Sequence, residues 1–295
     1  LGDVYKRQVE YLTYGSGTPE KFYDDFDEDG EVYSLCIAPD GSVYAALRGL
    51  ASPGAEHGRL PVIYHISPEG KLLNSFTVGE REWNIVDSMA TDAQGRLYMR
   101  IRMQEDGSYV RIYSAEGELI GTVADDDSYA VQGAGALGQG KDGKVYAAAL
   151  ATENVTAEDD PVTLVSVDPE RLCFLPVQGD AAENAKAVQS TGTIYQWNMV
   201  AAGVSDGSDF ILWGYSGVDT YRLEDAEFTR AQEVWEMPCG TEGTCAVIVP
   251  DGRILYIGAT GGVQGQTAAG VDISGKDPAK TYFYLSLIHI SEPTR

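Results

Sequence analysis

The chain has 295 residues, with 45 Asp and Glu against 21 Lys and Arg, so its formal net charge at pH 7 is −24. A charge of this sign and size repels nucleic-acid phosphates and anionic membrane surfaces, and we expect neither as a partner. The chain has only three histidines, which argues against a histidine-dependent triad or a multi-histidine metal site, and its four cysteines include no Cys-x-x-Cys pair. No apolar run approaches the roughly 20 residues of a membrane span.

The two ends of the chain look like translated sequencing adapter. Residues 1–8 (LGDVYKRQ) and 285–292 (LSLIHISE) can be encoded by opposite strands of one short DNA segment, which looks like the transposase adapter of shotgun sequencing. We therefore interpret residues 1–8 and 285–295 as adapter-derived, and residues 9–284 as part of a longer natural polypeptide truncated at both ends.

Between the ends, short β-branched and aromatic runs alternate with glycine turns, while helical periodicity is almost absent. A turn glycine followed three or four residues later by an aromatic residue recurs in five segments: APDGSVYAAL (38–47), DAQGRLYMRI (92–101), GKDGKVYAAA (140–149), VSDGSDFILW (204–213) and VPDGRILYIG (249–258). Tight hairpins place a residue at positive φ, where glycine avoids a Cβ clash. The recurring segments therefore predict hairpins.

A second turn follows in the early units, at residues 68–71, 115–118 and 168–171. Two hairpin turns per unit give four strands, and such units at intervals of roughly 45–64 residues are typical of a β-propeller. A β-sandwich also has many short strands, but it would not repeat one turn at this interval. We predict an all-β fold: a β-propeller of four-stranded antiparallel blades, about five of them visible, forming an incomplete, open arc. Residues 9–28 are interpreted as the tail of a preceding blade, and the fifth blade is expected to stop inside its third strand, at 281–284.

The repeated pattern (I/M/V)-x-x-D-G-x-(V/L)-Y with its following E-G turn spans nearly all of residues 30–284. It resembles bacterial NHL-like and related periplasmic or surface propellers. Similar repeats stand at the front of large secreted lipoproteins of gut Firmicutes, ahead of an extracellular solute-binding domain. The resemblance implies an extracellular or cell-surface location, with other domains of the same longer chain as partners.

Two predicted inner strands begin with a shared Trp-Asn pair, and tyrosines precede two others in comparable places. In a propeller these starts surround one mouth of the central channel, where aromatic rings and amide groups suit a carbohydrate or peptide ligand. The alternative is that both tryptophans pack between blades. The candidate ligand-binding residues are Trp83, Asn84, Trp197, Asn198, Tyr33 and Tyr129.

An acidic run contains Asp25-x-Asp27-x-Asp29-Gly30, the spacing of the first half of a calcium loop. Cys36 stands where such a loop would supply a bidentate glutamate. We expect a solvated acidic turn and no cofactor, with Ca²⁺ on Asp25, Asp27 and Asp29 as the alternative.

Two other residue types give weaker signals. His65 alternates with apolar neighbours in VIYHI, which predicts a half-buried strand residue rather than a catalytic one. Cys36 and Cys173 are predicted to be small core residues. Cys239 and Cys245 bracket a short loop, and both a disulfide and free thiols remain open.

No nucleophile-elbow, zinc-protease, phosphate-loop or dinucleotide-binding motif is present in the sequence. We expect a non-catalytic ligand-binding or scaffolding propeller of a secreted or cell-surface bacterial protein. The alternative is a propeller-type hydrolase or lyase acting on a carbohydrate or lactone, with Asn84, Asn198, Asp87 and Glu242 at the channel mouth. A structural spacer that positions another domain is the third hypothesis.

Overall fold

In the computed structural model every secondary-structure element of the described residues is a β-strand. The described residues are 9–12, 19–26, 30–49, 60–79, 84–103, 107–130, 137–151, 162–177, 196–201, 209–214, 217–222, 227–233, 242–248, 254–260, 267–272 and 281–285. Among them no helix is long and apolar enough to cross a membrane.

The strands form one two-stranded sheet and five larger sheets, which we call the half-blade and blades 1 to 5. The half-blade pairs β1 (Val9–Leu12) with β2 (Pro19–Tyr23). Blade 1 consists of β3 (Gly30–Ile37), β4 (Val43–Gly49), β5 (Val62–Ile66) and β6 (Leu72–Thr77). Blade 2 consists of β7 (Ile85–Thr91), β8 (Leu97–Met103), β9 (Gly107–Tyr113) and β10 (Leu119–Ala124).

The remaining blades follow the same order. Blade 3 consists of β11 (Tyr129–Ala130), β12 (Leu137–Gln139), β13 (Val145–Ala151), β14 (Val162–Asp168) and β15 (Cys173–Pro176). Blade 4 consists of β16 (Gln196–Ala201), β17 (Phe210–Gly214), β18 (Gly217–Arg222) and β19 (Glu227–Glu233). Blade 5 consists of β20 (Glu242–Ile248), β21 (Ile254–Thr260), β22 (Thr267–Asp272) and β23 (Thr281–Leu285).

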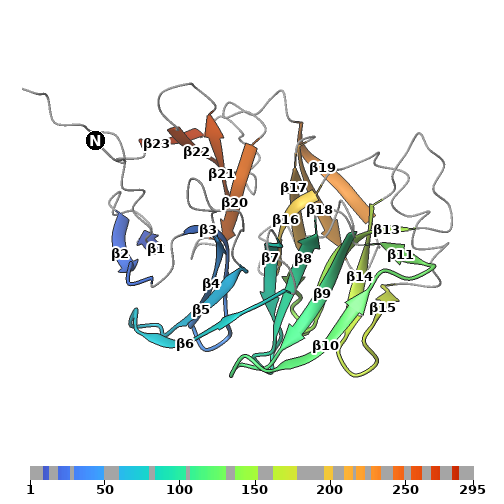
Figure 1. The fold of residues 1–295 in the computed structure, drawn as a ribbon. Coiled ribbons are helices and arrows are strands. Elements are labelled where there is room, and N and C mark those ends of the chain that lie inside the picture. Colours follow the sequence, from blue (N-terminus) through green and yellow to red (C-terminus); the bar gives the residue numbers. More distant parts are fainter. Residues whose placement is uncertain are drawn as a thin grey trace, which may run out of the picture.

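Each four-stranded blade is an antiparallel meander in chain order, and the sheets fan out side by side (Figure 1). The innermost strands make the contacts between consecutive blades: β3 with β7, β7 with β12, β12 with β16, and β16 with β20. This arrangement confirms the predicted β-propeller of four-stranded antiparallel blades.

Two details differ from the prediction. The inner position of blade 3 is divided between β11 and β12, which both pair with β13. Blade 5 has all four strands, so the expectation that it stops inside its third strand was wrong. Its third strand is β22, a segment of Thr, Ala, Gly, Val and Asp that has few strand-forming residues and pairs with β21 along its whole length.

The first hairpin turn of each early blade is held by its glycine and its aspartate. Gly41, Gly95 and Gly143 have φ of 85°, 80° and 77°, as the turn pattern predicted. In blade 2, Asp92 accepts hydrogen bonds from the backbone N–H of Gln94 at 2.9 Å and from the Tyr98 hydroxyl at 2.9 Å. The Tyr146 hydroxyl donates to Asp142 at 3.0 Å in blade 3. In blades 2 and 3 the tyrosine after the glycine therefore anchors the turn, whereas in blade 1 Asp40 accepts hydrogen bonds from Ser42.

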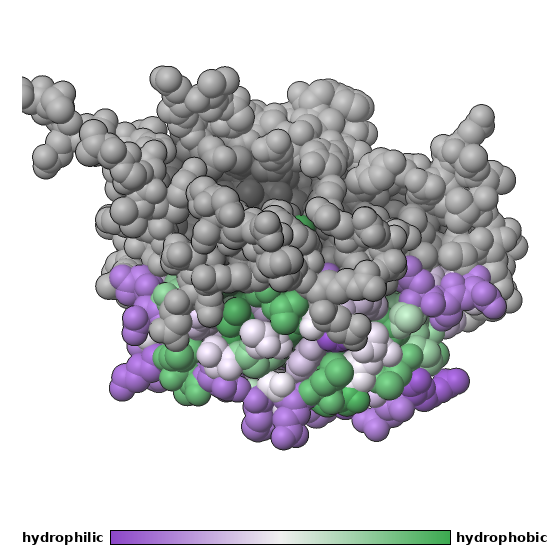
Figure 2. Space-filling model, viewed as in Figure 1, coloured by the Kyte–Doolittle hydropathy of each residue, from purple (hydrophilic) through white to green (hydrophobic). Residues whose placement is uncertain are grey.

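Both hairpin turns of a blade lie at one end, because its first and third strands run in the same direction. We call this the turn end. The opposite end, near which the inner strands carry the β-bulges described below, is called the bulge end. At the turn end, neighbouring blades also meet, since the Ala93 N–H donates to the Gly143 carbonyl at 2.9 Å. Exposed apolar residues begin the outer strands here, namely Leu72, Leu73, Leu119 and Ile120. Figure 2 shows exposed apolar side chains among polar ones on the described part of the surface.

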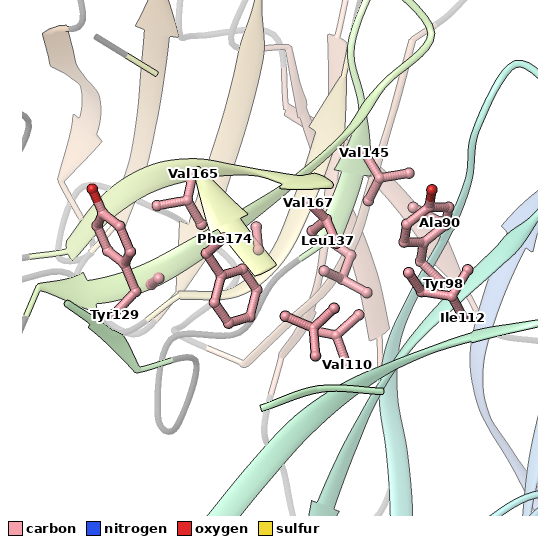
Figure 3. Close-up of a cluster of buried hydrophobic side chains, with 13 residues drawn as sticks. Ala90, Tyr98, Val110, Ile112, Tyr129, Leu137, Val145, Val165, Val167 and Phe174 are labelled. Carbon is pink, nitrogen blue, oxygen red and sulfur yellow. The ribbon is translucent and has the colours of Figure 1, made fainter. Parts of the chain in front are cut away.

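The hydrophobic core lies between blades rather than in one central cluster. Between blades 1 and 2, Tyr44 and Ile63 pack with Leu97 and Met99. Between blades 2 and 3, side chains from both sheets fill the intervening space, including Tyr98, Ile112, Leu137, Val145 and Phe174 (Figure 3). Successive side chains of a strand point to opposite faces, so strands with apolar residues at consecutive positions suit sheets that are packed on both faces.

Candidate functional site

Four inner strands share one irregularity, in which the ladder to the second strand skips a single residue. The skipped residues, which we call the bulge positions, are Tyr33 of β3, Asp87 of β7, Trp197 of β16 and Thr244 of β20. Each is followed by four paired residues: Ser34–Ile37, Ser88–Thr91, Asn198–Ala201 and Cys245–Ile248. Bulges of this kind redirect side chains and are common at barrel rims and beside active sites.

This register brings together only part of the predicted site. Tyr33 and Trp197 occupy the same bulge position in blades 1 and 4, and Asn198 directly follows it. Asn84 instead lies one residue before β7, three residues ahead of Asp87, and Trp83 lies outside the described residues. The two Trp-Asn pairs are therefore a repeat of sequence and not of structural position.

Asn84 and Tyr129 are both buried. The Asn84 side chain is 3% exposed, and within the described part of the chain its Nδ2 has no hydrogen-bond partner. A Cβ at Gly79 would come within 2.7 Å of that nitrogen, so the glycine leaves room for the amide. Tyr129 begins β11 and belongs to the core cluster that includes Val165 and Phe174 (Figure 3). In this structure these two side chains lie beneath the surface of the bulge end.

The residue that follows the bulge links neighbouring blades, a role that sequence reasoning missed. The Ser34 Oγ donates to the Val86 carbonyl of β7 at 2.9 Å. In the next blade the Ser88 Oγ accepts a hydrogen bond from the Leu137 N–H of β12 at 2.9 Å. The two serines hold equivalent positions, so the bulges of blades 1 and 2 are fixed to the blade that follows each. Each serine lies seven residues before the turn glycine of its blade, Gly41 or Gly95, so the turn alignment extended backwards relates the two positions, but their contacts with the next blade are seen only in the structure.

Histidine and its neighbours lie at the other end of the blade. His65 is 8% exposed, its ring stacks on Tyr44 with centroids 4.0 Å apart, and its Nε2 lies 2.8 Å from the Ser42 Oγ. Burial lowers the pKa of His65, while the hydrogen bond from Ser42 lowers the pKa of Asp40. His65 is thus a strand residue, as predicted, and more deeply buried than the half-buried position expected. It supports the first turn of blade 1 rather than the bulge end.

The predicted calcium site falls mostly on residues that are not described. Asp27 and Asp29 lie outside the described residues, and Asp25 is exposed, with its backbone carbonyl accepting a hydrogen bond from the Tyr23 hydroxyl at 2.6 Å. Across the part of the chain that the structure describes, no group of three His, Cys, Asp or Glu side chains could hold a metal ion. The calcium hypothesis therefore stays a prediction.

The prediction that Cys36 and Cys173 are core residues holds only in part, because neither is fully buried; Cys36 packs against the core between blades 1 and 2. Cys36 and Cys173 are partly buried and have free thiols. Burial raises the pKa of the Cys36 thiol to about 12. Cys239 lies outside the described residues, and its pairing with Cys245 stays open.

No protein-family model and no curated protein sequence matches this chain. Among solved structures, it is similar to a putative TolB from Agrobacterium tumefaciens, with a TM-score of 0.55 and 10% identity over 91% of this chain and 84% of that one. It is also similar to a protein of unknown function from Dyadobacter fermentans, with a TM-score of 0.52 and 14% identity over 87% of this chain and 82% of that one. At this identity the similarity extends to the fold alone. The chain therefore has the β-propeller fold, with recurrent bulges at one end of its inner strands.

Proposed function

We propose that this chain is a non-catalytic ligand-binding or scaffolding β-propeller of a secreted or cell-surface bacterial protein, with its ligand site at the bulge end. The observation that carries the proposal is the recurrent bulge. Four inner strands leave one residue out of the ladder at the same step, and two of these residues are Tyr33 and Trp197. A repeated interruption of pairing costs backbone hydrogen bonds in four blades, and a binding rim gives it a use.

The residue types at these positions favour a carbohydrate. Aromatic rings pack against the C–H faces of a sugar, and polar groups beside them bind its hydroxyls. The bulge positions supply Tyr33 and Trp197 as aromatic residues and Asp87 and Thr244 as polar ones, with Asn198 next in the chain. A peptide with aromatic or amide side chains would use the same chemistry, and a direct comparison of the two ligand classes belongs in the test.

A binding role is favoured over hydrolysis by the charge of these positions. Glycoside hydrolysis uses two carboxyl groups about 5 to 9.5 Å apart. The four bulge positions contain one carboxylate, Asp87. The hydrolase or lyase alternative would need Glu242 or another acidic residue to complete a pair.

The experiment is a calorimetric titration of the chain with a panel of soluble oligosaccharides and short peptides. We expect an oligosaccharide to bind and the Trp197→Ala variant to bind it at least about tenfold more weakly, as expected for loss of an aromatic anchor. Phe228→Ala is the matched control, because Phe228 lies on the outer strand β19 of the same blade. The affinity of this variant for the oligosaccharide should equal that of the parent chain.

Three results would argue against the proposal. Absence of binding to every probe, or equal losses in Trp197→Ala and Phe228→Ala, would remove the bulge end as the binding site. Release of a cleaved product during the titration, lost in Asp87→Asn, would replace the binding role with the hydrolase or lyase alternative.

A further inference from the structure

The first two strands of blades 1 and 2 can be aligned residue by residue through their ladders. In blade 1, Leu35 pairs with Ala45 and Ile37 with Val43. In blade 2, Met89 pairs with Met99 and Thr91 with Leu97 at the same steps after the bulge. Leu35 is therefore the counterpart of Met89, and Ile37 the counterpart of Thr91. Because side chains alternate along a strand, all four lie on the face that each blade turns toward the sheet before it.

These counterparts differ sharply in exposure. Met89 is 6% exposed and Thr91 is 2% exposed, because β3 of blade 1 packs against β7. Leu35 is 49% exposed and Ile37 is 72% exposed. Among the described residues, no inner strand packs against Ile37 in the way that β3 packs against its counterpart Thr91.

The remainder of the same face of blade 1 is covered. Ala45, Leu47, Tyr64 and Ile66 are fully buried in one cluster with Tyr23. Contact with the half-blade is direct, since the rings of Tyr23 of β2 and Tyr64 have centroids 6.3 Å apart, and Phe26, just after β2, meets Tyr64 edge to face with centroids 4.9 Å apart. The half-blade thus covers the second and third strands of blade 1 and leaves the strip formed by Leu35 and Ile37 of β3 open.

The half-blade itself lacks the strands that would cover this strip. It is a sheet of β1 and β2 only, so among the described residues one edge of β1 has no strand partner. In each blade that follows, an inner and a second strand precede the outer pair. Additional strands could pair with the edge of β1 and cover the exposed apolar strip of β3.

We propose that the Leu35–Ile37 strip and the open edge of β1 together form the docking surface for two further antiparallel strands of the natural polypeptide. Their backbone would extend the β1 ladder, and their alternating apolar side chains would cover Leu35 and Ile37. We infer the occupant from the interface between blades 2 and 3. There the first two strands of blade 2, β7 and β8, present Ala90 and Tyr98 to blade 3. The two further strands would present apolar residues to blade 1 in the same way. The proposal is independent of the ligand site.

The test adds the missing strands to the full chain. A copy of residues 84–103, which contains β7 and β8, is fused through a short Gly/Ser linker ahead of Val9. Ile37→Cys supplies a reporter thiol, and its modification by a maleimide is located by peptide mass spectrometry. We expect the added copy to slow modification at least about tenfold and to raise the Tm. In the matched control, the residues of the copy that correspond to Ala90 and Tyr98 are replaced by Asp, and the reporter should react as fast as in the unfused chain.

Unchanged labelling with the intact copy would overturn the proposal, as would equal protection by the Asp-bearing copy. A reporter thiol that is already protected in the unfused chain would also overturn it. In that case, dimers dissociated by Ile37→Lys would identify a second copy of this chain as the occupant.

Discussion

The turn aspartate of blade 2 gives the most direct test of how the blades are stabilised. Asp92 is buried, and its carboxylate accepts hydrogen bonds from the N–H groups of Gln94 and Arg96, from the Arg96 Nε at 2.6 Å and from the Tyr98 hydroxyl at 2.9 Å. Asp142 of blade 3 accepts from the Lys144 N–H at 3.1 Å and the Tyr146 hydroxyl at 3.0 Å and forms an ion pair with the Lys144 Nζ at 3.5 Å, and its side chain is 40% exposed. The two residues perform one task in different environments.

We expect Asp92→Ala to lower the free energy of unfolding by about 3 kcal/mol. Two lost backbone hydrogen bonds account for about 1 kcal/mol each, and the buried Tyr98 hydroxyl left without its acceptor accounts for at least about 1 kcal/mol more. Asp142→Ala should cost about 1 kcal/mol, because water can replace the lost partners at an exposed site. Tyr98→Phe in the Asp92→Ala background should recover part of the loss, since it removes the orphaned hydroxyl.

The assay is urea unfolding followed by circular dichroism, in which the parent chain is compared with four variants of unchanged m-value: Asp92→Ala, Asp142→Ala, Tyr98→Phe and the Asp92→Ala/Tyr98→Phe double variant. The reasoning would be refuted if Asp92→Ala cost no more than Asp142→Ala. It would also be refuted if Tyr98→Phe added its full cost on top of that of Asp92→Ala, because the hydroxyl would then have other adequate partners.

Three further predictions concern other groups. Gly95→Ala should lower the free energy of unfolding in urea by about 1 kcal/mol, through its positive φ alone, because no atom lies near the position of the added Cβ. Gly70→Ala should cost more, because its Cβ would lie 2.4 Å from the Phe22 carbonyl oxygen. Equal losses in the two variants would contradict this. Burial lowers the pKa of His65 in the folded state, so as pH falls the unfolded chain is protonated first, and stability should decrease below about pH 6.5. His65→Gln should flatten the plot of urea midpoint against pH in this range. Parallel plots for the variant and the parent would count against the prediction. Because burial raises the pKa of Cys36 to about 12, its thiol should resist iodoacetamide at pH 8 in the native chain and react only on unfolding. Peptide mass spectrometry would locate the label. Rapid labelling of the native chain would disprove the burial of the thiol.

The sequence was most informative at the turn end, where local chemistry decides the structure. Gly41, Gly95 and Gly143 have the positive φ that the glycine pattern implied, and the aromatic residue after each glycine has a local reason, shown by Tyr98 and Tyr146. A hairpin turn is specified within about five residues, so a single chain displays it. Repetition of the turn then implied the blades.

Prediction from sequence was weaker wherever pairing partners decide the outcome. A bulge is a relation between two strands, so Tyr33 and Trp197 could be singled out as aromatic residues, but their equivalence required the ladder register. The same limit explains why Trp83-Asn84 was aligned with Trp197-Asn198, and why β22 was missed. Leu172 is a related case, since it has a φ of 53° near the point where the other second turns use Gly70 and Gly117.

The two ends of the blades differ in a way that bears on the proposed function. At the turn end of blades 1 to 3, each turn aspartate accepts a hydrogen bond from a serine or tyrosine hydroxyl. The Ala93 N–H also donates to the Gly143 carbonyl and so joins blade 2 to blade 3. At the bulge end the ladder is interrupted in four blades, while Ser34 and Ser88 hold the interrupted strands against their neighbours. Stability alone gives no reason to interrupt the ladder at the same step in four blades, and in blades 1 and 2 the interruption is also held in place by a serine. Rigid support directly beneath a set of unpaired positions is what a binding rim requires, because a pre-organised site loses less conformational entropy when it takes up its ligand.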